Sequence, residues 1–169
     1  ATMGWSMLHQ AAMEGKVDTI QDEIYKKGTL VNDKTELTGM TPLHKACQYG
    51  HVRAVEELIK EEADVNARND WGCTCLHWAV KGSTQTQQEK KGDAGDQYEQ
   101  IVHLLVQASK KLLDTKSNGH PGETPLQMAN RLKAENLAKI LEKKGEQLMK
   151  ERKLADEKKI RNKPKVRRI

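Results

Sequence analysis

The sequence predicts an all-α solenoid of four short helix-turn-helix repeats, with hairpin-like loops between them and a basic helix at the C-terminal end. Two observations lead to this prediction. A motif close to Gly-x-Thr-Pro-Leu-His recurs from Gly4, Gly39, Gly72 and Gly122, at spacings of 35, 33 and 50 residues. These spacings equal a period of 33 residues with insertions of 2, 0 and 17. Each motif is followed by apolar residues at intervals of three and four, the pattern of a second, amphipathic helix.

The second copy of the motif shows why each repeat begins as a helix. Thr41 can cap a helix by accepting a hydrogen bond from free N–H groups of its first turn. Pro42 is tolerated at the first helical position, because the N–H that it lacks would have no partner there. Gly50 is suited to end this helix, since glycine readily adopts the left-handed conformation found at helix ends. The apolar residues that predict the second helix are Val52, Val55, Leu58 and Ile59.

The first and last copies depart from the motif, as terminal repeats commonly do. Ser6 and Met7 replace the threonine and the proline in the first copy, and Gln127 and Lys133 replace the histidine and the closing glycine in the fourth. We expect a repeat domain of residues 1–145 and a basic helical tail of residues 146–169. The expected repeats are at about 4–36, 37–69, 70–119 (with an insertion at 83–99) and 120–145.

Residues 4–145 resemble the ankyrin-repeat family, through the 33-residue period and the well-matched copies that begin at Gly39 and Gly72. A two-helix unit of this size cannot bury its apolar face alone, so stacked copies are needed to build a continuous core. The resemblance implies a non-catalytic protein–protein interaction module or adaptor. Its partner, a peptide segment or a folded domain, would bind the concave face formed by the hairpin tips and the exposed sides of the first helices.

Aligning the copies identifies the residues that the resemblance assigns to this concave face. The tips carry Trp5, Leu37, Thr38, Met40, Asp70, Trp71, Cys73, His120 and Glu123, and the first helices carry Met13, Glu14, Gln48, Tyr49, Lys81 and Arg131. The candidate partner-binding residues among them are Trp5, Met13, Leu37, Met40, Gln48, Tyr49, Asp70, Trp71, Lys81 and Arg131. Tryptophan and tyrosine are over-represented at binding hot spots, and methionine suits adaptable contacts. The alternative is that Trp5 and Trp71 pack on neighbouring hairpins, and Trp78 is expected between repeats.

The sequence favours neither catalysis nor a cofactor. It contains no nucleotide-binding glycine loop, no Gly-x-Ser-x-Gly and no His-Glu-x-x-His. Cys73, Cys75 and His77 form the one cluster that could attract a metal, but zinc sites usually need four ligands and no second pair lies nearby in the sequence. The recurring histidines are expected to bond the backbone of the neighbouring repeat instead. We therefore expect no enzyme, cofactor or metal, with a metal-dependent role of Cys73 and Cys75 as the weaker alternative.

The insertion at 83–99 is polar and contains Gly92 and Gly95 near its middle. It is expected to be a solvated loop that helices enter from both ends. Long loops are often functional. The alternative is a tolerated surface insertion without a function, because added loop length costs little free energy. Both readings remain open from the sequence.

Positive charge is concentrated in the tail. Residues 1–142 contain 17 basic and 20 acidic side chains, whereas residues 143–169 contain 12 basic and 4 acidic ones. A helix is expected to run to about Arg161, and Pro164 would stop it. The cluster could be a solvated helix or a linker, a nuclear-import signal, or a contact to nucleic acid or an acidic protein surface. Its basic residues are Lys158, Lys159, Arg161, Lys163, Lys165, Arg167 and Arg168.

The remaining features predict a reducing compartment. The three cysteines form no even disulfide framework, and the start of the chain lacks the pattern of a secretory signal. No stretch reaches the roughly 18 apolar residues of a membrane span. We expect a monomer in the cytoplasm or the nucleus, without insertion into a membrane.

Overall fold

A computed structural model of the chain describes residues 4–87, 94–119 and 121–165. Within these ranges the secondary structure consists of eight α-helices and one 3-10 turn, without strands, so the predicted all-helical repeat fold is confirmed. The elements are α1 (Met7–Glu14), α2 (Val17–Tyr25), α3 (Pro42–Gln48), α4 (Val52–Lys60), α5 (Cys75–Gln87), α6 (Ala94–Ala108), η1 (Lys110–Leu113), α7 (Pro125–Arg131) and α8 (Glu135–Arg161).

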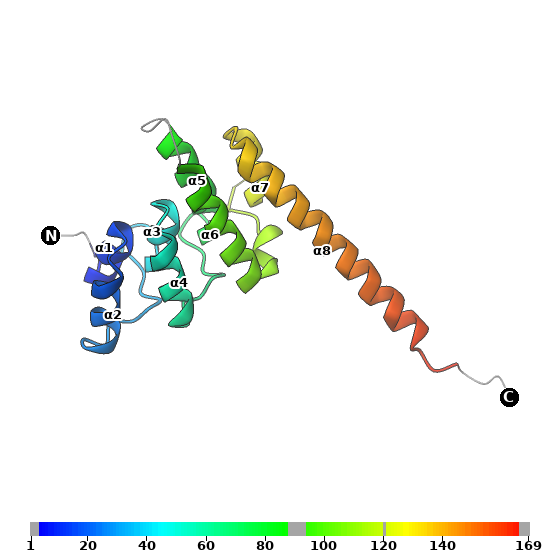
Figure 1. Cartoon of the computed structure of the whole chain (residues 1–169), viewed down its shortest axis with the longest axis horizontal. Helices are drawn as coiled ribbons and strands as arrows, with labels where there is room; N and C mark the ends of the chain where they lie inside the picture. Colours follow the sequence, from blue (N-terminus) through cyan, green and yellow to red (C-terminus); the bar gives the residue numbers. More distant parts are fainter. Residues whose placement is uncertain (1–3, 88–93, 120, 166–169) are drawn as a thin grey trace.

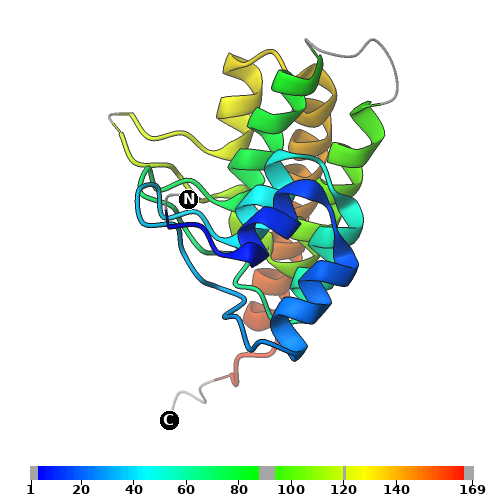
Figure 2. The same cartoon turned by 90° about the vertical axis from the view of Figure 1, so that its left-hand side faces the viewer.

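The helices form two rows, and the connecting loops project to one side. The first helices α1, α3, α5 and α7 pack on one another in that order, and the second helices α2, α4, α6 and α8 form the outer row. Figure 1 shows the helix pairs side by side in chain order, and Figure 2 shows the long loops extending together from the layer of first helices. The loops therefore project on the side of the first helices, which is the side on which the family resemblance places the concave face.

The repeated motif builds each first helix and joins it to the next repeat. Ser6, Thr41 and Thr124 each form a capping box with the residue three positions later. In the boxes that end in His9 and His44, ring Nδ1 accepts a hydrogen bond from the capping residue's N–H. The free N–H groups at the start of each helix are thus satisfied locally, which is why the sequence could predict these helix starts.

The opposite side of each histidine ring bridges the repeats, as predicted. Nε2–H of His9 donates to the carbonyl of Met40 at 2.8 Å, and His44 does the same to Cys73 at 3.0 Å. His77 donates to the carbonyl of Glu123 at 2.8 Å. These bonds are buried or partly buried and join residues 29 to 46 positions apart. The histidine framework therefore fixes the spacing between one hairpin and the next.

Helices α5 and α6 are longer than their counterparts because the insertion extends both of them. The helix α5 has 13 residues where α3 has 7, and α6 has 15 where α4 has 9. The expectation of a solvated loop was wrong for Ser83 and Tyr98, which are buried. The O–H group of Tyr98 donates to the carbonyl of Gln48 at 2.9 Å. This part of the insertion is buried because the extended helices pack on the end of α3.

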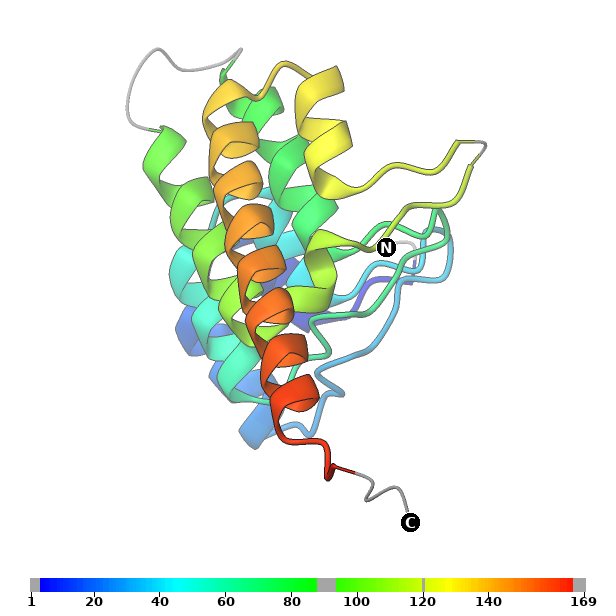
Figure 3. The ribbon, with the colours of Figure 1, turned by 90° about the vertical axis from the view of Figure 1, so that its right-hand side faces the viewer.

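Helix α8 is continuous from the repeats into the tail. It ends at Arg161, as predicted, and passes through residue 145 without a break. Leu148 is buried and Arg152 forms an ion pair with Asp114 at 2.9 Å, whereas all described residues from 153 onward are exposed. The packed part of the chain therefore extends beyond the predicted boundary at residue 145. Figure 3 shows α8 crossing the outer row and leaving the body at its lower end.

Candidate functional site

Trp71 stands at the tip of the loop between α4 and α5, which leads into the third repeat and forms the third hairpin. Its side chain is half exposed, and its backbone is held by neighbouring residues. Its side chain is 52% exposed. Its N–H group donates to Oδ1 of the buried Asn69 at 3.0 Å, and its carbonyl accepts from the N–H of Asn118 at 2.8 Å. Its ring faces that of Trp78, with 6.4 Å between the centroids and a tilt of 59°. The hairpin backbone therefore presents a large apolar side chain in a fixed position.

A cavity of about 270 Å³ lies beside this aromatic pair. It is bounded by the third hairpin, by helix α5 and by helix α7. Its lining is mainly apolar or aromatic, with two cations at the edge. The lining residues are Trp71, Cys73, His77, Trp78, Lys81, Met128, Arg131 and Leu132. Small pre-formed cavities with an apolar lining and few polar groups are typical of ligand-anchoring sites.

The polar groups of this cavity differ in how they are paired. The Arg131 guanidinium donates to both carboxylate oxygens of Glu123, at 2.6 and 2.9 Å, and this lowers the pKa of Glu123. The Lys81 ammonium lies 4.7 Å from the centroid of the Trp78 ring. Nε1 of Trp78 is buried and has no hydrogen-bond acceptor among the described residues. Of the two cations that line the cavity, Arg131 is thus paired with Glu123, whereas Lys81 lies over the Trp78 ring.

His77 also lines the cavity, and both of its ring nitrogens form hydrogen bonds within the fold. Its Nδ1 accepts from the N–H of Thr74 at 3.1 Å while Nε2–H donates to the Glu123 carbonyl. Burial lowers the pKa of His77. Both ring nitrogens are therefore engaged in holding the repeats together.

A further cation, Lys45, lies on the neighbouring first helix α3. Lys45 is only 8% exposed, and burial lowers the pKa of its ammonium. Its Nζ lies 4.0 Å from the centroid of the Trp5 ring, a cation–π contact. Nearby, Oε1 of Gln48 is buried without a hydrogen-bond donor among the described residues. A buried lysine without a carboxylate partner is unusual, because burial of an unpaired charge is costly.

The other residues predicted for the concave face are distributed unevenly. Leu37, Tyr49 and Asp70 are exposed, and Met13 is half-buried. Met40 is a correction: it is 2% exposed, and its sulfur accepts from Nδ2 of Asn69 at 3.2 Å. Its side chain fills the base of the hairpin, so it is not available to a partner. His120 lies outside the described residues.

Sequence reasoning missed four residues that line or flank the site. Lys45, Trp78 and Met128 each follow the histidine position of the motif by one residue, and Leu132 follows it by five. Trp78 was expected to pack between repeats, and its ring does contact Trp71, yet it also lines the cavity. The available signal was the variability of this position among the copies, which carry Gln, Lys, Trp and Met there.

The three cysteines are free thiols, and the side chains of Cys47 and Cys75 lie next to each other. Cys47 and Cys75 are buried and Cys73 is half-buried. The thiol of Cys75 donates to the carbonyl of Val65 at 3.1 Å, and burial raises the pKa of Cys73. Among the described residues, no three side chains of the His, Cys, Asp or Glu type are grouped so as to hold a metal ion.

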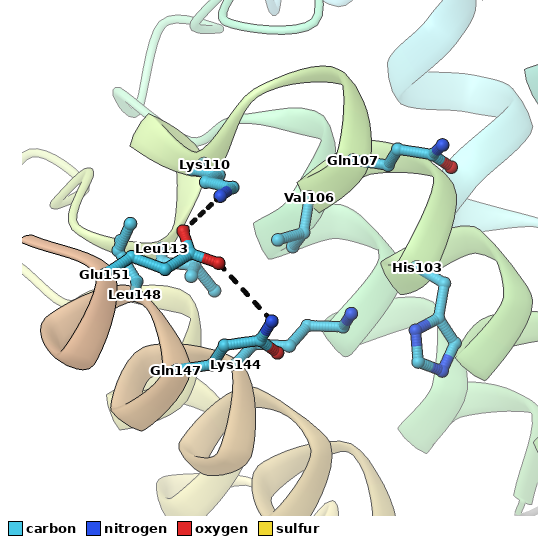
Figure 4. A pocket seen from close by; sticks show the side chains of 9 residues that line it. All are labelled: His103, Val106, Gln107, Lys110, Leu113, Lys144, Gln147, Leu148 and Glu151. Carbon is cyan, nitrogen blue, oxygen red and sulfur yellow. Dashed lines mark hydrogen bonds and ion pairs between the residues drawn. The ribbon is translucent and has the colours of Figure 1, made fainter. Parts of the chain in front are cut away.

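A second cavity, of about 280 Å³, lies between the outer helices α6 and α8 and the turn η1. Figure 4 shows Glu151 of α8 bonded to Lys110 of η1 across this cavity and to Gln147 of its own helix. Much of its polar lining is thus paired internally, and its walls are the surfaces through which α8 docks. The lining residues are His103, Val106, Gln107, Lys110, Leu113, Lys144, Gln147, Leu148 and Glu151.

The basic residues of the tail that the structure describes, from residue 158 to 165, line neither cavity. Lys158, Lys159 and Arg161 lie exposed on the last turns of α8, and Lys163 and Lys165 are exposed beyond it. Arg167 and Arg168 lie outside the described residues. No described helix is both long and apolar enough to cross a membrane.

Comparison with known proteins gives consistent matches over the repeats. Residues 8–88 match the family profile described as ankyrin repeats (3 copies). The chain is 30% identical over 132 residues to neurogenic locus notch homolog protein 1 of Danio rerio, which covers 78% of the chain and 5% of that protein. It is 31% identical over 122 residues to the human notch homolog 1, covering 72% of the chain and 4% of that protein.

A further relative is the transient receptor potential cation channel subfamily A member 1 homolog of Caenorhabditis elegans. It is 41% identical over 76 residues, which cover 45% of the chain and 6% of the channel. The chain thus spans a small part of each of these relatives. The residues that match the family profile, 8–88, contain the capping box of α3 and the stacked helices α2 to α4 described above. From this agreement of sequence and structure we conclude that the chain belongs to the ankyrin-repeat family.

Proposed function

We propose that the chain is a non-catalytic protein-interaction module, and that its partner binds the concave face at the cavity beside Trp71. Ankyrin repeats in general are protein–protein interaction modules. The observation that carries the proposal is the cavity itself, where a half-exposed tryptophan and a second aromatic ring form one wall. Tryptophan is among the residues most enriched at binding hot spots, and a pocket that exists before binding avoids part of the ordering cost.

Two features of the site support recognition rather than catalysis. The His77 ring has both nitrogens engaged, and the Glu123 carboxylate is held by Arg131, so neither is available as a base. Trp71 is fixed through Asn69 and Asn118, which favours a rigid anchor for a partner side chain. The exposed or half-buried residues proposed to surround this anchor are Trp5, Met13, Leu37, Gln48, Tyr49, Asp70, Lys81 and Arg131.

Replacement of Trp71 by alanine is expected to weaken partner binding by at least about 30-fold, the loss that corresponds to a hot spot of ~2 kcal/mol. The full chain, immobilised, would capture the partner from an extract for identification by mass spectrometry, and titration of the purified partner would give the dissociation constants. Tyr25→Ala is the matched control, because Tyr25 is an aromatic side chain exposed on the outer helix α2. Unchanged affinity of a folded Trp71→Ala protein would exclude the cavity as the binding centre.

A second candidate function rests on the tail. The helix α8 carries its basic residues away from the body, and those described are exposed, which suits contact with nucleic acid or an acidic protein surface, or nuclear import. In that case Lys158→Gln/Lys159→Gln would weaken binding of single-stranded or duplex DNA and flatten its salt dependence, measured by fluorescence anisotropy at several salt concentrations. Binding that is insensitive to both salt and these substitutions would rule the nucleic-acid mode out. We place the chain in the cytoplasm or the nucleus, as a monomer.

A further inference from the structure

We infer that the concave face binds an extended acidic segment of the partner, with one carboxylate at Lys45 and another at Lys81, next to an apolar side chain in the Trp71–Trp78 cavity. This inference rests on the proposed function and adds the chemistry of the partner. It follows from the unpaired cations of the first helices and from the spacing of those helices.

Lys45 is the stronger of the two observations. It is 8% exposed, and its ammonium contacts the Trp5 ring rather than a carboxylate. An ammonium has three N–H donors, and no described acceptor lies within hydrogen-bond distance of this one. Buried charges are normally paired, because removal from water is costly. An incoming carboxylate would supply the missing partner.

Lys81 is an exposed cation on the next first helix, α5. Its ammonium also lies over a tryptophan, Trp78, and no described carboxylate forms an ion pair with it. Two acidic side chains that the alignment assigns to the concave face already form ion pairs, Glu14 with Lys16 and Glu123 with Arg131. The first helices therefore carry two cations, Lys45 and Lys81, that are not neutralised within the described chain.

Asp70 on the third hairpin does not neutralise Lys81. Its carboxylate packs against the second hairpin, where a Cβ added to Gly39 would lie 2.4 Å from Oδ1 of Asp70. Gly39 has a φ of +66°, so the close approach needs a glycine at this turn. The acidic groups on the hairpins thus leave both lysines open to an external carboxylate.

The spacing of the lysines suits an extended peptide. Lys45 and Lys81 lie on helices that pack directly on one another, and packed helices are roughly 8–10 Å apart. Lys45 follows the motif histidine by one residue and Lys81 by four, so the two are also offset by about one helical turn. In polyproline II conformation every third side chain lies on the same face, at about 9.3 Å from the last. Acidic residues three positions apart would therefore reach both lysines, and an apolar residue shortly beyond them would reach the cavity between α5 and α7.

Selection of random 12-residue peptides displayed on phage against the immobilised full chain tests this inference. Enriched peptides are expected to carry Asp or Glu three positions apart, close to an apolar residue. Synthetic versions should bind Lys45→Met and Lys81→Gln proteins at least about tenfold more weakly, as expected for loss of a charge-assisted hydrogen bond. Lys60→Gln removes an exposed positive charge from the outer helix α4 and is the matched control, with unchanged affinity expected.

Lys45→Met preserves the aliphatic stem of a buried residue, so it separates recognition from folding. Because the native lysine is buried without an ion-pair partner, this variant should unfold at the same or a higher temperature than the wild type. A lower unfolding temperature together with loss of binding would indicate a structural role for Lys45 and overturn the inference.

The remaining outcomes separate the inference from the proposed function. Peptides that lose binding to Trp71→Ala but bind both lysine variants as tightly as wild type would overturn the acidic-segment inference alone. Peptides that depend on none of the three residues would overturn both. Failure to enrich any peptide would overturn the acidic-segment inference alone, because the proposed function also allows a folded domain as the partner. Binding of single-stranded DNA that is lost in Lys45→Met would show a polyanion site and overturn the peptide assignment.

Discussion

Acidification from pH 7 to pH 4 is expected to lower the free energy of unfolding by about 3 kcal/mol through His44 alone. Burial lowers the pKa of His44 from 6.5 to about 4, and a tenfold difference in proton affinity is worth about 1.4 kcal/mol. The unfolded chain binds the proton more tightly than the folded one. Stability from this group is therefore complete above about pH 6.5 and is lost as the pH falls towards 4.

His9 and His77 should add to this loss in the same direction. Burial lowers the pKa of both, and each donates from Nε2 to the carbonyl of the following hairpin. Glu14, Glu123 and Glu151 have pKa values lowered from 4.5. The stability that they add is lost only at lower pH, so they add little to the change in the free energy of unfolding above about pH 5. Urea unfolding followed by circular dichroism at pH 7.5, 6.5, 5.5 and 4.5 would isolate the histidine contribution.

His44→Gln is the matched variant, because the fourth repeat already uses Gln127 in the same capping role. There Oε1 of Gln127 accepts from the N–H of Thr124 at 2.9 Å. The variant should cost about 1–3 kcal/mol at pH 7.5, since the Cys73 carbonyl loses its donor. It should also lose less stability on acidification than the wild type. Equal loss in both proteins would contradict the assignment to His44.

Alanine at two helical glycines is expected to change stability in opposite directions. Gly82→Ala should lower the free energy of unfolding by about 1–3 kcal/mol, the usual cost of overpacking. An added Cβ there would lie 2.0 Å from the carbonyl oxygen of Gln48 and 3.0 Å from the ring of Tyr98. Helix α5 would have to move away from α3, and backbone atoms cannot yield as a flexible side chain does.

Gly145→Ala should instead raise the free energy of unfolding by about 0.5–1 kcal/mol, because alanine is the better helix former. A Cβ at Gly145 in α8 meets no atom within 4 Å. Urea unfolding of the two variants beside the wild type measures both effects. If Gly82→Ala were as stable as Gly145→Ala, the close contact between α5 and the end of α3 would be wrong.

The tertiary contacts of Tyr98 connect this stability prediction to the concave face. Its hydroxyl donates to the carbonyl of Gln48, a residue of the proposed binding surface, and its ring lies against Gly50 and Gly82. The inserted segment of the third repeat thus supports the end of α3.

The sequence by itself determined the repeat, the helix starts and the bridging role of the histidines. These depend on local chemistry: Thr41 and His44 are three residues apart, and a capping box forms within one turn. The period of 33 residues then predicts where the same elements begin in the next copy. The position of Trp71 in the loop, directly before the repeat glycine Gly72, followed from the same alignment.

Only the tertiary structure decided which of those positions are accessible and what surrounds them. Met40 and Trp71 both occupy hairpin positions next to a repeat glycine, yet Met40 is 2% exposed and Trp71 is 52% exposed. The burial of Lys45 and Tyr98 and the docking of α8 likewise depend on residues of neighbouring repeats. Periodicity fixes which residues share a helix face, but burial is set by side chains that meet across stacked repeats, tens of residues apart in the chain.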